Sequence, residues 1–192
     1  MDKNVLFIDL GLPSGTLWAD RNIGANRPEE SGEYYRWGEV IPCTTESPEY
    51  IFRRFSYNSK NDVATIRLGK MCKTPNNEQI EELINFCDVI WIQENSLNGI
   101  KIIGKNFNSI FIPASGYLSP NKDIIYDREV SGFVWSSSKY INYTVISPCL
   151  CIFDKNRYIS PMGRNHGLPI RSVWVNSPIN RKMLRLKGNS RT

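Results

Sequence analysis

The chain has 192 residues, 41% hydrophobic and 22% charged, which is enough for one sizeable core and short for two. The formal net charge of +5 comes from the C-terminal end, because residues 155–192 hold nine Lys and Arg and no acid. Residues 1–154 carry nineteen acids against fifteen bases, and this acidic balance argues against a broad phosphate-binding groove and a nucleic-acid partner.

The cysteines and the apolar runs of the sequence indicate in which cellular compartment the protein is expected. The five cysteines are odd in number and show no paired spacing, which favours free thiols over a disulfide framework. The apolar run near the N-terminus is interrupted by Asp9 and is too short for a signal peptide, and no later run approaches a membrane span. We therefore expect no membrane span, and a location that is either cytoplasmic or associated with a phage or cell surface.

The first 60 residues predict short strands joined by turns. Trp18 is expected to anchor the core, Pro28 to begin a single helical turn, and residues 41–60 to form a long surface loop. Strands are expected at residues 5–10, 16–19 and 32–39.

One main helix is predicted at about residues 75–87. Thr74 offers an N-cap oxygen, and Pro75 has the backbone angle favoured at the first helical position. The apolar residues follow helical spacing and should pack on a sheet as one stripe: Ile80, Leu83, Ile84 and Cys87.

The remainder has the pattern of β-structure. Asn98-Gly99 is expected to form the two-residue turn of a hairpin, because both residues accept a positive φ. The fold class is therefore α+β, with mixed short antiparallel strands, one main helix and long loops. Strands are expected at residues 89–92, 100–103, 109–113, 133–137, 145–153 and 168–175.

An ordered series of motifs resembles the Fibrobacter succinogenes major paralogous domain family, which is abundant in Bacteroidetes. The resemblance covers about residues 5–175. It is carried by Asp9–Ala19, Asn22–Ala25, Gly32–Glu39, Thr74-Pro75, Glu81–Ile84, Asn98-Gly99, Ile112–Tyr117, Trp135–Ser138 and Pro169–Val173.

This resemblance implies a C-type-lectin-like fold, which is also the fold of formylglycine-generating enzymes and of variable proteins diversified by retroelements. Residues 1–175 would form the single domain, and residues 176–192 a basic, flexible tail. In such relatives the segment between the Trp-Ser-Ser-Ser motif and the terminal Arg-x-Val forms the exposed ligand-binding face. Family members are often found at the cell surface.

Catalytic alternatives have few candidate residues. Cys149 and Cys151 lie two apart on a predicted strand, so they point to one face and could bind a soft metal, as an oxidase related to formylglycine-generating enzymes would require. Packing of both thiols in an apolar strand is the simpler interpretation. His166 is the single histidine, and the hydroxyls of Ser136–Ser138 are expected to bond backbone at a strand end. We expect no catalytic residue, metal or cofactor.

The remaining hypothesis is a non-catalytic module that recognises a protein or glycan surface through residues 139–166. Tyr gives contact area at low entropic cost, and Asn and Arg supply adaptable hydrogen bonds. A structural subunit of a surface or phage particle is a further alternative. The candidate ligand-binding residues are Lys139, Tyr140, Asn142, Tyr143, Asn156, Arg157, Tyr158, Arg164, Asn165 and His166.

Overall fold

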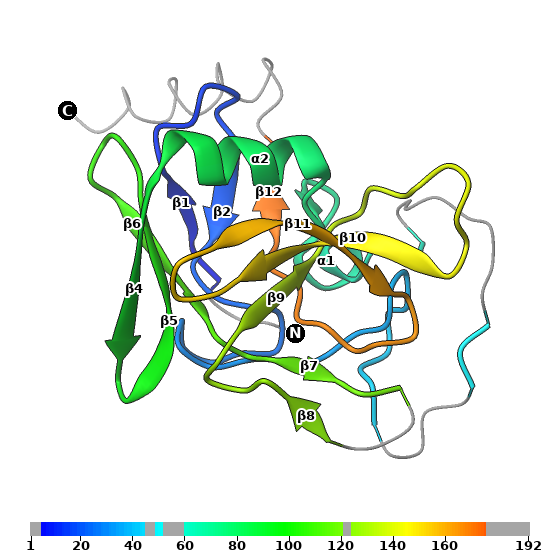
Figure 1. Ribbon diagram of the computed structural model, residues 1–192. Helices are drawn as coiled ribbons and strands as arrows, with labels where there is room; N and C mark the ends of the chain where they lie inside the picture. Colours follow the sequence, from blue (N-terminus) through cyan, green and yellow to red (C-terminus); the bar gives the residue numbers. More distant parts are fainter. Residues whose placement is uncertain (1–4, 45–48, 52–59, 121–123, 176–192) are drawn as a thin grey trace.

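The computed structural model describes residues 5–44, 49–51, 60–120 and 124–175. In these ranges the chain is α+β with small antiparallel sheets, as the sequence predicts, and it has two helices (Figure 1). One sheet joins the two ends of the described chain. Its strands, in spatial order, are β1 (Phe7–Asp9), β2 (Leu17–Ala19), β12 (Val173–Trp174) and β3 (Cys72–Lys73).

Two three-stranded sheets and a short hairpin complete the β-structure of the described residues. One sheet has the order β11 (Arg157–Gly163), β10 (Ile146–Ile152), β9 (Gly132–Trp135). Another has the order β4 (Asp88–Glu94), β5 (Leu97–Ile103), β6 (Ser109–Pro113). The hairpin pairs β7 (Tyr117–Leu118) with β8 (Ile125–Tyr126).

The main helix, α2 (Asn77–Phe86), is confirmed, but its N-cap differs from the prediction. Asn76 caps it in a capping box with Gln79, and the prediction of Thr74 is wrong. The Thr74 hydroxyl instead donates to Asp62, at 2.7 Å. Asp62 caps a second, unpredicted helix, α1 (Val63–Leu68), and therefore ties α1 to the segment that enters α2.

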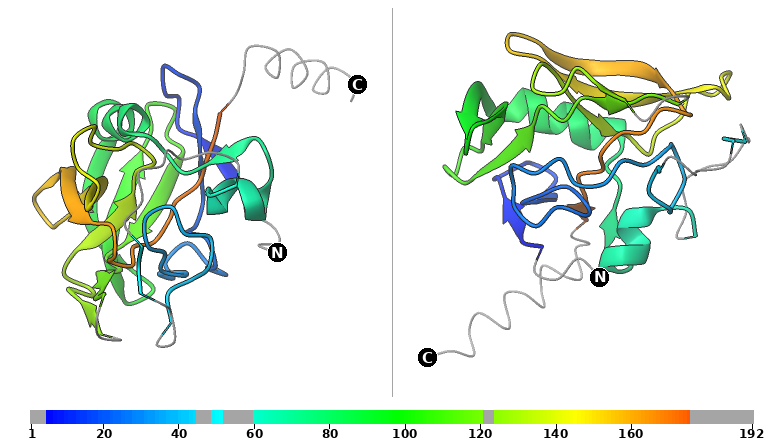
Figure 2. Two further views of the ribbon diagram at one scale, coloured as in Figure 1. Left: turned by 90° about the vertical axis from the view of Figure 1, so that its right-hand side faces the viewer. Right: turned by 90° about the horizontal axis from the view of Figure 1, so that it is seen from below.

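The first hydrophobic cluster lies under α2. Ile80 and Leu83 are fully buried there, Cys87 is buried and Ile84 is partly buried, which confirms the predicted stripe. The helix lies between the β11-β10-β9 sheet and the sheet that contains β1 and β2, as Figures 1 and 2 both show. Its partners come from all three larger sheets, and they include Trp18, Ile100, Ile102, Val134, Leu150, Ile152 and Val173.

The second cluster lies on the opposite face of the β11-β10-β9 sheet. Alternation along β9 sends Val134 toward α2 and both Phe133 and Trp135 into this second cluster. Trp37 and Trp135 are fully buried in it. Both faces of β9 and β10 are therefore covered, which explains why these strands are apolar without clear alternation.

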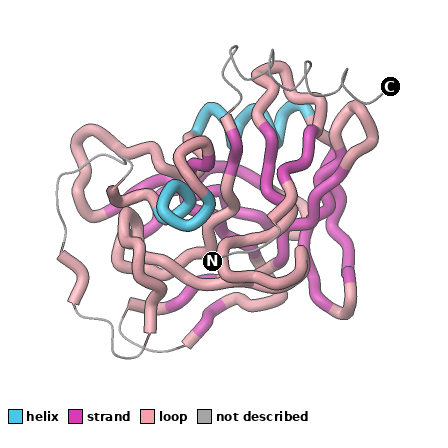
Figure 3. Tube along the Cα trace, turned by 180° about the vertical axis from the view of Figure 1, so that it is seen from behind, coloured by secondary structure: helices cyan, strands magenta, loops and turns pink. Residues whose placement is uncertain are grey.

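The strand expected at residues 32–39 and the helical turn expected at Pro28 are both absent from the described structure. Residues 32–39 form no strand, and only Tyr35 makes an isolated bridge, with Leu168. Pro28 begins a turn and not a helix. Loops make up much of the described chain, as Figure 3 shows.

Two expected segments lie wholly or partly outside the described residues. Of the predicted loop at 41–60, the described residues form no helix or strand, and 45–48 and 52–59 are outside. The predicted basic tail at 176–192 also lies outside the described residues.

Candidate functional site

The three serines after β9 attach this strand to the first turn of α2. Ser136 donates from Oγ to Asn77 Oδ1 (2.7 Å), and the Asn77 N–H donates to Ser138 Oγ (3.0 Å). The Ser137 N–H donates to the Pro75 carbonyl at 2.7 Å. The expectation that these hydroxyls bond backbone at a strand end is confirmed: Ser137 Oγ donates to the Pro75 carbonyl, and Ser136 Oγ accepts from the Ser138 N–H.

Two indole N–H groups lock the same strand to the segment around Trp37. Trp135 Nε1 donates to the Tyr35 carbonyl at 2.6 Å, and Trp37 Nε1 donates to the Ser136 carbonyl at 2.8 Å. A buried indole that is bonded in this way has a fixed orientation. The strands that carry the candidate residues therefore rest on a rigid support.

The ten predicted binding residues differ in exposure. Tyr143 is 58% exposed and Tyr158 is 47% exposed, whereas Arg164 is only 2% exposed. Tyr140, Asn165 and His166 are partly buried. The remaining exposed members are Lys139, Asn142, Asn156 and Arg157.

These residues do not form one compact patch. β10 and β11 pair antiparallel along their whole length, with Ile146 opposite Gly163 and Ile152 opposite Arg157. Seven-residue strands span about 20 Å. Residues 139–145 thus lie at one end of the hairpin and Asn156–Tyr158 at the other, as Figure 1 shows. Residues 157–163, which were expected to be loop, form β11.

Arg164 supports the surface from inside and does not lie on it, contrary to expectation. Its Nε donates to Ser147 Oγ at 2.8 Å and to the Ile146 carbonyl at 3.2 Å. Its guanidinium lies 4.0 Å from the ring centroid of Trp37. Because the planar cation stacks on an indole and bonds the start of β10, Arg164 holds the 143–147 segment against the second cluster.

A series of packed rings crosses this side of the molecule. Tyr117 stacks on Tyr126 with the centroids 5.6 Å apart, and it meets the edges of Phe133 and His166 at 5.5 Å. Phe133 meets Phe153 at 6.3 Å, and Phe153 stacks on Tyr158 at 6.0 Å. We call these six side chains the aromatic series.

The aromatic series is buried in its middle and open at its ends. Phe133 is 6% exposed, whereas Tyr126 and Tyr158 are 37% and 47% exposed. Burial lowers the pKa of His166, partly offset by its hydrogen bond with the Gly163 carbonyl. The neutral ring therefore dominates at neutral pH.

Four members of the aromatic series are absent from the ten sequence candidates: Tyr117, Tyr126, Phe133 and Phe153. Tyr117 and Tyr126 come from the unpredicted β7–β8 hairpin, so their pairing had no local signal. Phe153 could have been found, because it continues the i, i+2 alternation of Cys149 and Cys151 beyond the end of β10.

The two cysteines of β10 point to one face, as predicted. Their sulfur atoms are 3.7 Å apart, and both side chains belong to the second cluster, with Cys149 0% and Cys151 4% exposed. The hydrogen bond with Cys151, together with burial, raises the pKa of Cys149 well above its ordinary value. Cys149 is therefore a buried thiol at neutral pH. No group of three or more His, Cys, Asp or Glu is gathered among the described residues in a way that could hold a metal.

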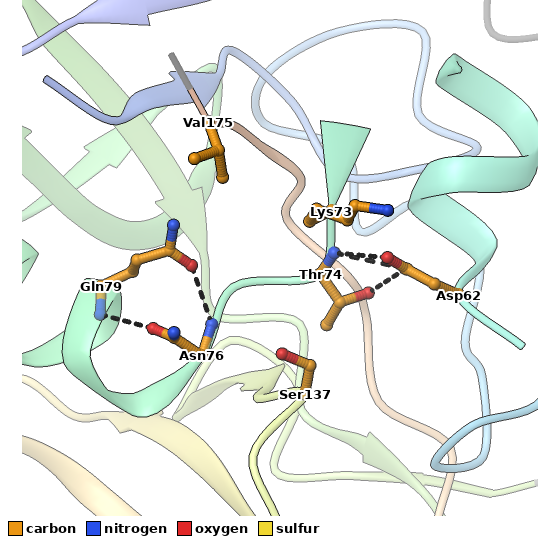
Figure 4. Close-up of a pocket in the computed structure, with 7 residues that line it drawn as sticks. All are labelled: Asp62, Lys73, Thr74, Asn76, Gln79, Ser137 and Val175. Atoms are coloured by element: carbon orange, nitrogen blue, oxygen red, sulfur yellow. Dashed lines mark hydrogen bonds between the residues drawn. The ribbon is translucent and has the colours of Figure 1, made fainter. Parts of the chain in front are cut away.

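A polar pocket of about 330 Å³ opens at the first turn of α2 (Figure 4). The Asp62 carboxylate on its wall accepts hydrogen bonds from the Thr65 hydroxyl and from both the N–H and hydroxyl of Thr74. Because these hydrogen bonds come from the chain itself, the Asp62 carboxylate stabilises the fold around the pocket. The pocket is lined by Asp62, Lys73, Thr74, Asn76, Gln79, Ser137 and Val175.

Among the described residues, no helix is both long and apolar enough to cross a membrane. Comparison of the chain with known protein families, with characterised proteins and with solved structures finds no match.

Proposed function

We propose that this protein is a non-catalytic binding module that recognises a protein or glycan surface through two regions, the aromatic series and the 139–145 segment. The observation that carries the proposal is the exposure of Tyr126 and Tyr158 at the two ends of a packed row of rings. Exposed rings held in fixed positions lose little entropy on binding.

The chemistry of these side chains suits either ligand class. Tyrosine offers an apolar ring face, on which a sugar ring or an apolar side chain can pack, and a hydroxyl that forms hydrogen bonds. Arg157 and Asn156 are exposed beside Tyr158 and add donors at this end. The combination of ring and polar donor is typical of binding hot spots.

The 139–145 segment supplies a second contact region. Ile141 is 91% exposed, Tyr143 58% and Val145 50%, and these side chains follow one another at every second residue. Exposed apolar side chains that gather on one segment are typical of interaction sites. Tyr140 meets the Tyr143 ring edge-on at 6.4 Å and so helps to order the segment.

We propose the C-type-lectin-like fold and membership of the major paralogous domain family on the motif series described above. In chain order, the Trp-Ser-Ser-Ser motif and the terminal Arg171-x-Val173 bracket the 139–145 segment, β10 and β11, as the resemblance implies for the ligand-binding segment. The same order of segments makes this protein a candidate for a retroelement-diversified variable protein.

The test uses two probes, an array of purified glycans and a phage-displayed peptide library. We expect the intact chain to bind members of one of them. Alanine at Tyr126 and Tyr158 together should weaken this binding by at least about tenfold, the effect of losing one hot-spot residue. Both tyrosines are on the surface, so the melting temperature should change by only a few degrees.

Two control variants make the test specific. Phe107→Ala removes an aromatic ring that is 90% exposed but lies in the connection between β5 and β6, and it should bind like wild type. Tyr158→Phe keeps the ring and should retain most of the affinity. Absence of binding to both probes, or equal loss in Phe107→Ala, would refute the proposal.

A further inference from the structure

A second surface, a groove of about 580 Å³, runs along α2 on the side that faces the β1–β2 connection. Phe86, at the end of α2, is 50% exposed in this groove. Acidic, polar and apolar side chains therefore share one concave surface. The residues that line it are Pro13, Ser14, Thr16, Asn76, Glu78, Gln79, Glu81, Glu82, Asn85, Phe86 and Val175.

The three carboxylates of the groove are used differently. Glu82 accepts hydrogen bonds from the Ser14 N–H at 2.7 Å and from Ser14 Oγ at 2.6 Å, so it fastens the β1–β2 connection to α2. Glu78 and Glu81 are exposed, and within the described part of the chain no Lys or Arg forms an ion pair with either of them. Two negative charges are thus available beside an exposed aromatic ring.

The last described residue, Val175, lies at this groove, and a basic segment follows it in the sequence. Val175 lines both the groove and the polar pocket, and Figure 4 places it beside Gln79. Residues 176–192 follow directly and contain no acid. Their basic residues are Arg181, Lys182, Arg185, Lys187 and Arg191, and their apolar residues include Ile179, Met183, Leu184 and Leu186.

The composition of residues 176–192 and the distance that they can span both match the groove. A ten-residue helix such as α2 is about 15 Å long, whereas seventeen residues can extend over about 55 Å. Because the segment is covalently attached where the groove begins, its effective concentration there is of millimolar order. Any separate basic peptide would have to compete with it.

We propose that residues 176–192 bind in this groove, with basic side chains against Glu78 and Glu81 and apolar side chains against Pro13 and Phe86. This binding gives the acidic face of α2 an intramolecular partner, separate from the ligand-binding surface proposed above.

Zero-length cross-linking of the full chain tests this directly. A carbodiimide joins a carboxylate to a lysine amine only when the two groups are in contact. In the monomer fraction at low salt we expect amide links from Lys182 or Lys187 to Glu78 or Glu81. They should be at least about fivefold more abundant than links to the exposed Asp154 or Glu129, a ratio that two weak surface ion pairs can produce. At about 1 M salt, where the screening length is about 3 Å, the excess should disappear.

Matched variants control for charge and for chemistry. Glu78→Gln with Glu81→Gln should abolish these links, whereas Asp154→Asn with Glu129→Gln removes as many charges elsewhere and should leave them unchanged. Lys182→Arg with Lys187→Arg keeps the positive charge but removes the amines, so it must eliminate the signal. Links spread evenly over all exposed acids, links found only between two chains, or no links from either lysine would each overturn the proposal.

Discussion

Two fully buried arginines, Arg164 and Arg171, each bond backbone carbonyls of segments distant in sequence. Arg171 is 0% exposed and donates to Asn22 Oδ1 and to the carbonyls of Ala19 and Phe111, at 2.8–3.1 Å. Burial lowers its pKa to about 9. A buried cation is tolerated only where acceptors replace its water, and these residues provide them.

Replacing Arg164 with Met should destabilise the protein by about 2–4 kcal/mol, because the Ser147 hydroxyl and nearby carbonyls lose their buried donor. Urea unfolding measures the change. Arg164→Lys keeps the charge but not the flat face on Trp37, so it should also lose stability. A change below about 0.5 kcal/mol in Arg164→Met would be typical of a surface residue and would contradict this role.

The role of Arg164 shows what local sequence leaves open at the scale of a residue. Arginine is exposed in most proteins, and Gly163 and Asn165 on either side indicate a polar turn. Its decisive neighbour, Trp37, is far away in the chain. By contrast Tyr143 and Tyr158 were correctly expected to be exposed, because polar flanking residues bear on exposure directly.

At the scale of elements, the β4–β5 hairpin places its turn at Asn95-Ser96, three residues before the predicted Asn98-Gly99. Both turn residues have positive φ, 48° and 67°. This register sets Trp91 opposite Ile100 and Val89 opposite Ile102, so apolar residues pair across the strands. Gly99 lies within β5, where an added Cβ would be 2.4 Å from the Ile112 carbonyl oxygen.

Two substitutions should affect this hairpin in opposite directions. Ser96→Gly should stabilise the protein by about 0.5–1 kcal/mol, because glycine adopts the left-handed conformation without steric cost. Gly99→Ala should destabilise it by more than about 2 kcal/mol, because β6 backbone would have to move. Thermal unfolding of both variants checks the register, and the reverse pattern would place the turn at Asn98-Gly99.

The elements that the sequence predicted well are those with a clear apolar pattern of their own. The stripe of α2 was found because its apolar residues repeat at helical spacing, and the strand at Ser109–Pro113 because its apolar run is short and ends at a proline. The N-cap was misassigned because Thr74 and Asn76 are both good capping residues, and the choice depends on Asp62, which binds Thr74. The β7–β8 hairpin and α1 are too short to show a period.

At the scale of the whole molecule, the β11-β10-β9 sheet belongs to both hydrophobic clusters. Leu150 and Ile152 face the first cluster, and Cys149 and Cys151 face the second. Because these strands pack against both clusters, loss of packing in one cluster should also disorder the strands that form part of the other. Pairings of this kind, and that of β12 with β2 and β3, join distant segments and leave no local trace in the sequence.

The described domain should therefore unfold in one step. Near-ultraviolet circular dichroism follows the tryptophans, far-ultraviolet follows the strands, and the two transitions should coincide. Trp135→Ala should lower the stability by about 3–5 kcal/mol, because it leaves a cavity and removes the indole hydrogen bond to the Tyr35 carbonyl. Two separated transitions in the wild-type protein would show that the clusters are independent.

The outermost place of β11 in its sheet bears on how such a protein can evolve. Arg157, Tyr158 and Pro161 project from a strand that has a neighbour only in β10 within the described chain, while Ile159 alone keeps contact with the first cluster. Mutations at the three projecting positions change the chemistry offered to a ligand and leave the interior intact. A lineage can therefore explore new specificities here one codon at a time, without first acquiring compensating changes elsewhere.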